Sequence, residues 1–148
     1  MVGGLAGLGA AAQAGKERVA VTDARGFADA MAGTGDDWGI ISRAVEGPSY
    51  LLNSVRGDGL TRVEQMRTNL SAARRFLSDR GQAEAVQGID RTLAALGGLR
   101  VVLALAEPDQ SAAGEGVDAV SDACAACHAR FREGSEQTGF RARPGLLE

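Results

Sequence analysis

The sequence predicts an all-α protein folded as an antiparallel four-helix bundle. Apolar residues recur every three or four positions over most of the chain, the spacing of one face of a helix. No stretch offers several short segments of alternating polarity, as strands would. The breaks between the apolar stripes are short, so successive helices should be antiparallel neighbours. A length of 148 residues, 45% of them hydrophobic, suits a single domain with one core.

The first apolar stripe runs from Trp38 to Val55, and Asp36-Asp37 before it supply an N-cap. Gly47-Pro48 must kink or split this segment, because proline lacks a backbone donor and clashes with the preceding turn. We expect Gly57-Asp58-Gly59 to end it.

The second stripe spans Val63–Leu77. Thr61 followed by Glu64 is a capping-box pattern at its start, and Gly81 closes it. A third stripe over Val86–Leu103 continues until Glu107-Pro108. The third helix should stop there.

A fourth stripe spans Val117–Phe131; its helix should begin between Asp109 and Glu115 and end near Gly134. These four helices define a domain over residues 36–134. Residues 15–35 form an N-terminal extension that includes a short helix around Asp23–Met31. Residues 135–148 form a flexible tail.

Residues 1–14 carry no charge and end in Ala12-Gln13-Ala14, the pattern of a signal-peptide remnant with its cleavage site. An Ala/Gly-rich end is the alternative interpretation. The signal interpretation predicts a periplasmic or secreted protein. No later run of 18 or more apolar residues occurs, so we expect no membrane span.

Composition narrows the function further. Sixteen basic against nineteen acidic residues give a net charge of -3, without the basic excess that a nucleic-acid-binding protein needs. Only six residues are aromatic, so Leu, Val, Ile and Ala must fill the core. Such a core leaves room for an apolar cofactor.

The sequence Cys124-Ala125-Ala126-Cys127-His128 has the spacing of a c-type haem attachment site. Residues three apart on a helix project from one face, so two thiols can bond the two vinyl groups at one porphyrin edge. The adjacent histidine can then coordinate the iron through a neutral ring nitrogen. The sequence therefore predicts one covalent haem c on the last helix.

Three other interpretations of the cysteines compete with a haem site. A thiol-redox site requires the pair at the start of a helix that follows a strand, whereas this pair is late in a helix. A zinc site needs a fourth ligand, and the chain has one histidine. In the third interpretation, the two cysteines are structural residues of a haem-free helical interaction domain.

The run from Cys124 to Arg132, near the C-terminus of four predicted helices, resembles the class II c-type cytochromes, the cytochrome c-prime type of four-helix bundle. The haem motif and the Phe131-Arg132 that follows it are the specific part of this resemblance. The rest of the chain agrees with the family only in the arrangement of its helices. It implies that Cys124 and Cys127 attach the haem, that His128 is the axial ligand, and that Arg132 lies at the haem edge. It also implies a homodimer.

Two further side chains belong to the candidate haem site. Phe131 is expected to pack against the haem. Arg130 and Arg132 suit haem propionates, because a guanidinium fork matches carboxylates, and Arg132 is preferred. The alternative for both arginines is a solvated helix end.

The resemblance leaves the sixth iron ligand open, because low-spin relatives use a methionine of the first bundle helix and the c-prime proteins leave that iron face open. If the first bundle helix is 37–57, it holds no methionine and the iron is five-coordinate. If the segment Phe27–Met31 belongs to that helix, Met31 can supply a thioether. Met66 is a third option, but in its apolar stripe a methionine is usually core filler.

The leading hypothesis is a monohaem cytochrome that carries single electrons between redox partner proteins and is not itself an enzyme. The second is a module that binds or senses nitric oxide or carbon monoxide at an open iron face. The third is the haem-free interaction domain.

Overall fold

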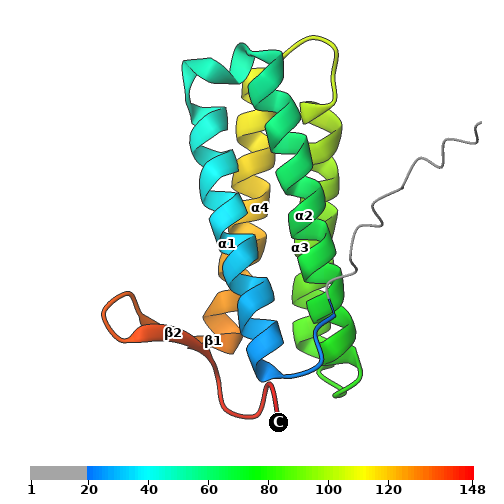
Figure 1. Cartoon of the computed structure of the whole chain (residues 1–148), viewed down its shortest axis with the longest axis vertical. Coiled ribbons are helices and arrows are strands. Elements are labelled where there is room, and N and C mark those ends of the chain that lie inside the picture. Colours follow the sequence, from blue (N-terminus) through cyan, green and yellow to red (C-terminus); the bar gives the residue numbers. More distant parts are fainter. Residues whose placement is uncertain (1–19) are drawn as a thin grey trace, which may run out of the picture.

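The computed structural model describes residues 20–148, so the signal-peptide hypothesis for residues 1–14 lies outside it. Within this part the chain forms an up-and-down bundle of four antiparallel α-helices (Figure 1), as the sequence predicts. The helices are α1 (Ala24–Glu46), α2 (Asn53–Ser78), α3 (Ala83–Leu103) and α4 (Gln110–Phe131).

The start of α1 differs from the expectation. The Asp23 side chain accepts a hydrogen bond from the Gly26 amide at 2.7 Å and is the actual N-cap. Asp36-Asp37 therefore lie inside α1, and residues 24–35, expected in an extension with a short helix, belong to one long helix. Nothing in that segment breaks a helix strongly enough, because a glycine costs only about 1 kcal/mol and tertiary packing can offset it.

The predicted break at Gly47-Pro48 is confirmed: α1 ends at Glu46, and a 3-10 turn, η1 (Pro48–Leu51), leads into α2. The predicted helix end at Gly57-Asp58-Gly59 is wrong, because all three residues lie within α2. The capping box at Thr61 is also wrong; its hydroxyl donates to the Gly57 carbonyl inside the same helix at 3.1 Å. Gly59 is buried, and a Cβ built on it would lie 3.6 Å from a methyl group of Leu103 in α3. Packing against α3 therefore outweighs the low helix propensity of the glycines.

The other two helix junctions follow the sequence. Gly81, with φ +69°, lies between α2 and α3 as predicted. The end of α3 before Pro108 is also confirmed. Asp109 caps α4 by accepting from the Ala112 amide at 3.0 Å, which fixes a start that the sequence left within a range.

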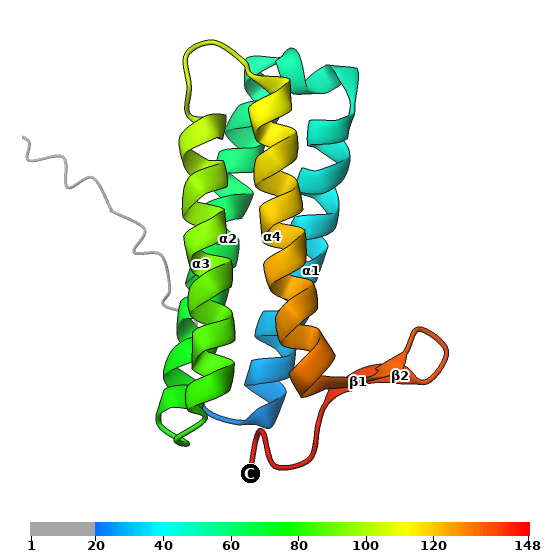
Figure 2. The ribbon, with the colours of Figure 1, turned by 180° about the vertical axis from the view of Figure 1, so that it is seen from behind.

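The expected flexible tail, residues 135–148, is wrong. The chain leaves α4 in an antiparallel hairpin of β1 (Arg132–Ser135) and β2 (Gly139–Ala142), which projects sideways from the lower end of α4 (Figure 2). The last residues then return to the bundle: Leu146 is buried in the core, and Gln82 donates to the Gly145 carbonyl at 2.8 Å. Sequence reasoning missed this because one buried leucine carries no periodic signal.

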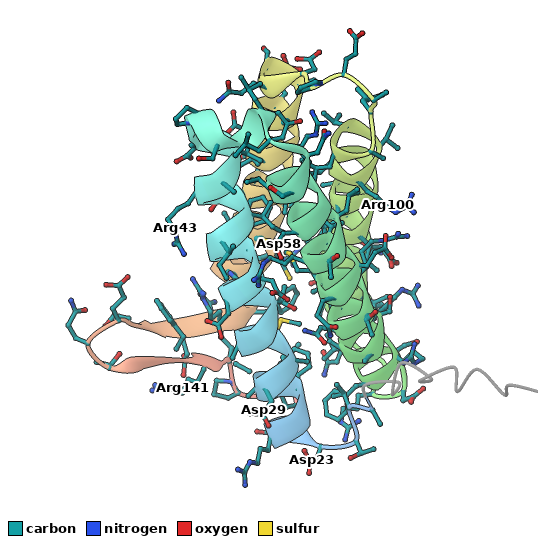
Figure 3. All side chains as sticks on the ribbon, turned by 45° about the horizontal axis from the view of Figure 1, so that its top comes forward. Asp23, Asp29, Arg43, Asp58, Arg100 and Arg141 are labelled. Carbon is teal, nitrogen blue, oxygen red and sulfur yellow. The ribbon has the colours of Figure 1, made fainter. Side chains whose placement is uncertain are left out.

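The core runs along the axis of the bundle and consists mainly of aliphatic side chains, with Phe27 and Phe76 packed at a ring-centroid distance of 5.8 Å. Charged side chains such as Asp29, Arg43 and Arg141 point outward (Figure 3). None of the helices between residues 20 and 148 combines the length and hydrophobicity needed to span a bilayer.

Candidate functional site

The candidate site is the C-terminal part of α4, at the end of the bundle where the hairpin begins (Figure 2). Cys124, Cys127 and His128 all lie on this helix and are all half-buried. Both cysteines are free thiols. The helical spacing therefore places two unpaired sulfurs and one imidazole on adjoining faces of one element.

Cys127 faces α3. A Cβ built on buried Gly88 would lie 2.7 Å from the Cys127 Sγ atom, closer than real contacts allow. The glycine thus leaves a hollow in α3 that this thiol occupies. One turn further along α3, the Thr92 hydroxyl donates to the Gly88 carbonyl at 3.2 Å.

Cys124 lies on the inner side of α4 and packs against the core. Burial raises the pKa of its thiol, and the neighbouring Cys127 raises it further, while Thr92 and Arg132 oppose the shift. Burial likewise raises the pKa of the Cys127 thiol. Both sulfurs are therefore protonated at neutral pH. A redox-active thiol pair has the opposite property, and the C-terminal end of a helix does not stabilise thiolates.

His128 lies on the side of α4 that faces α1. Gln110, at the first turn of α4, donates to the Val45 carbonyl near the end of α1 at 3.2 Å. His128 is eighteen residues further on, which is five turns, so it lies on the same side about 27 Å along the helix. Because α1 is antiparallel to α4, the residue of α1 at the level of His128 is the one eighteen positions before Val45, which is Phe27. His128 is therefore level with the first turns of α1.

Met31 lies on the matching side of α1. Gly33 faces Asn69 of α2, with 3.3 Å between the Asn69 amide nitrogen and a Cβ built on the glycine. Met31 precedes Gly33 by two residues, which is a rotation of about 200° around the helix, so Met31 points away from α2. Because Met31 packs against the core, it lies toward α4, the other neighbour of α1.

Met66 and the aromatic residues have simpler roles. Met66 has no exposed surface and is core filler, as the sequence predicts. Phe131 is partly buried and packs against the core at the last position of α4. Trp38 also packs against the core, and Tyr50 is buried in it.

The imidazole of His128 is held in its neutral form. Burial lowers the pKa of His128, and the positive charge of Arg132 lowers it further. A neutral imidazole keeps a lone pair on one ring nitrogen, which is what coordination of a metal requires.

The two arginines after His128 differ in their surroundings. Arg130 forms an ion pair with Glu84 of α3 at 2.5 Å and is exposed. The guanidinium of Arg132 lies over the Phe140 ring, 4.0 Å from the ring centroid, and its amide caps α4 by donating to the His128 carbonyl. Of the two, Arg132 is the one whose charge reaches both Cys124 and His128.

Sequence reasoning missed Gly88, Thr92 and Phe140. A glycine in the middle of a predicted helix, with no capping role, is a signal of close packing that could have identified Gly88. Thr92 and Phe140 carry no such signal, because their roles depend on how α3 and the hairpin are placed.

A covalent haem and a bound zinc ion require different donor sets. Among residues 20–148, no three His, Cys, Asp or Glu side chains gather where they could hold a metal ion, whereas a zinc site needs four ligands. A haem c needs two thiols at this spacing and one neutral imidazole, all of which α4 supplies. Met31 and His128 face the same seam between α1 and α4, which is where such a group could be held between two ligands.

No protein-family model matches the chain, and neither a curated protein nor a solved structure matches it significantly. The chemistry of these residues is therefore the basis for assigning a function.

Proposed function

We propose that this protein is a monohaem c-type cytochrome that carries single electrons, with the haem bonded to Cys124 and Cys127 and with His128 as the axial ligand. The observation that supports it is the Cys124-Ala125-Ala126-Cys127-His128 array on the last helix of an antiparallel bundle, with two free thiols and a neutral imidazole. When bound, haem c supplies an iron that alternates between the ferric and ferrous states.

The chain's own residues would hold and shield the group. Cys124 and Cys127 fix one porphyrin edge to α4, so that attachment does not depend on a tight pocket. Phe131 offers an apolar surface next to that edge, and Arg132 a guanidinium for a propionate. The seam between α4 and α1 is packed less extensively than the one between α4 and α3, so a flat group enters it with less loss of packing.

Met31 is the sixth ligand that we propose. It belongs to the first bundle helix, lies on the α4 side of that helix and is about one turn from the level of His128. A thioether ligand would raise the reduction potential of the iron, which suits electron transfer to a redox partner protein. Export to the periplasm or out of the cell, and pairing into a homodimer, belong to the same proposal.

The decisive test is expression of the full chain with a c-type maturation system. We expect a coloured protein whose mass equals the polypeptide plus one haem, and whose haem absorbance stays with the chain after denaturation. The double variant Cys124→Ala/Cys127→Ala should lose all covalent haem, while Ala125→Ser, an exposed change on the same helix, should keep it. A colourless wild-type chain of bare polypeptide mass would overturn the proposal in favour of a haem-free helical domain.

Absorbance and spin state then distinguish electron transfer from gas binding. A low-spin ferric spectrum that becomes high-spin in Met31→Leu, but not in Met66→Leu, supports the Met31 ligand. A wild-type spectrum that is already high-spin, and that shifts on addition of nitric oxide or carbon monoxide, would instead support a gas-binding module.

A further inference from the structure

The hairpin after α4 holds an arginine–aromatic stack next to the candidate site. Arg132 pairs with Ala142 across the two strands, and Gly134 pairs with Phe140. Arg132 and Phe140 are therefore diagonal neighbours on one face of the hairpin. Because Gly134, opposite Phe140, has no side chain, the guanidinium of Arg132 can lie over the ring, 4.0 Å from its centroid.

The base of this hairpin is tied to the last turn of α4. The Arg143 amide donates to the Phe131 carbonyl at 2.9 Å, and the Arg143 guanidinium donates to the Ala129 carbonyl at 2.9 Å. The Arg132 amide donates to the His128 carbonyl. The strand that carries Phe140 is thus fixed relative to the helical turn that carries His128.

The charge of Arg132 has no competing partner within the part of the chain that the structure describes. Arg141 on the neighbouring strand pairs with Glu133 at 2.8 Å, and Arg130 pairs with Glu84. Among residues 20–148, no carboxylate pairs with Arg132, and the one charge-specific contact of its guanidinium there is the ring of Phe140. Arg132 nevertheless lies close to His128, because its amide caps the helical turn that contains this residue.

We infer that Phe140 is a positioning residue: its ring, held out by the hairpin, fixes the guanidinium of Arg132 beside His128 and so sets the positive charge next to the iron. This inference rests on the proposed function. A positive charge near the iron stabilises the ferrous relative to the ferric state and raises the reduction potential. Phe140 would therefore tune the potential through Arg132, without itself contacting the haem.

The first test is the reduction potential of the haem-loaded protein. Arg132→Gln should lower the reduction potential, and Phe140→Leu should lower it by a smaller amount. Phe140→Trp should keep the wild-type potential, since tryptophan holds a cation at least as well. Arg141→Gln is the matched control for Arg132→Gln, because it removes a neighbouring arginine of the same hairpin. It should have little effect on the potential, since Arg141 is exposed and pairs with Glu133.

The second test reads the stack directly by proton NMR of the full chain, with or without haem. The side-chain methylene signals of Arg132 should be shifted upfield by the Phe140 ring current, and Phe140→Leu should remove that shift. Phe140 is about half exposed at 51%, so this variant should fold.

The outcomes separate this inference from the proposed function. A haem-loaded Phe140→Leu protein with an unchanged potential, or a wild-type chain without the ring-current shift, overturns the positioning role while leaving the cytochrome proposal intact. A chain that never takes up haem overturns both the cytochrome proposal and the redox role of Phe140. A lowered potential together with a lost ring-current shift supports the inference.

Discussion

The two halves of α4 are packed differently. In the N-terminal half, Ala113, Val117 and Val120 are buried, and Gly116 allows α3 to approach. In the half that begins at Cys124, no residue is fully buried. One helix thus completes the hydrophobic core at one end and leaves its reactive side chains partly open at the other. The contrast indicates that the first half contributes more to stability, whereas the second half leaves the proposed haem-binding side chains half-buried.

The strongest test of this contrast compares Val120→Ala with Cys124→Ala in the chain made without haem. Val120 has no exposed surface, so its truncation should lower the free energy of unfolding by about 2 kcal/mol through lost burial and a cavity. Cys124 is half-buried, and its truncation should cost less than about 1 kcal/mol. Urea titration measures both, and equal losses would contradict a difference between the halves.

A second test uses two glycines of α3. A Cβ at Gly97 meets nothing within 4 Å, so Gly97→Ala should stabilise the protein by about 0.5–1 kcal/mol. A Cβ at Gly88 would clash with the Cys127 sulfur, so Gly88→Ala should instead destabilise it by about 1 kcal/mol.

The Cys127→Ala background is the control for this pair. With the sulfur removed, Gly88→Ala should no longer destabilise, and the two changes should show a clear coupling energy in a double-mutant cycle. Additive effects would show that the hollow at Gly88 is not shaped around this thiol.

The smallest expected effect is a pH dependence confined to the half of α4 that contains His128. Burial lowers the pKa of folded His128 below its ordinary value of about 6.5. The neutral ring therefore stabilises the fold above that pH, and this contribution is lost as the pH falls through the folded pKa. In the chain made without haem, unfolding free energies measured between pH 8 and about 5 should decline less for His128→Gln than for the wild type; parallel curves would exclude a buried neutral imidazole.

Much of the bundle was predictable from the sequence. The apolar stripes gave α3 and α4 nearly complete, and the Gly47-Pro48 break separates α1 from α2 as expected. The errors arose where a local signal competed with packing. Gly57-Asp58-Gly59 and Asp36-Asp37 resemble ends of helices, yet both lie inside helices that their neighbours stabilise.

Of the candidate site, the sequence could predict the two cysteines and the histidine but not their surroundings. The spacing of Cys124, Cys127 and His128 is local information and can be read from the chain. The hollow at Gly88 and the stack of Phe140 on Arg132 depend on which elements meet in space. No periodicity or motif encodes such contacts.

The hydrogen bonds of Gln110 to the end of α1 have one more consequence. Its amide donates to the Val45 and Gly47 carbonyls, next to the proline that prevents α1 from continuing. These bonds stop α4 from sliding along α1 at the end of the molecule remote from the cysteines. Substitutions around His128 would then leave the register of α4 against α1 unchanged, so the same positions of the two helices would still face each other.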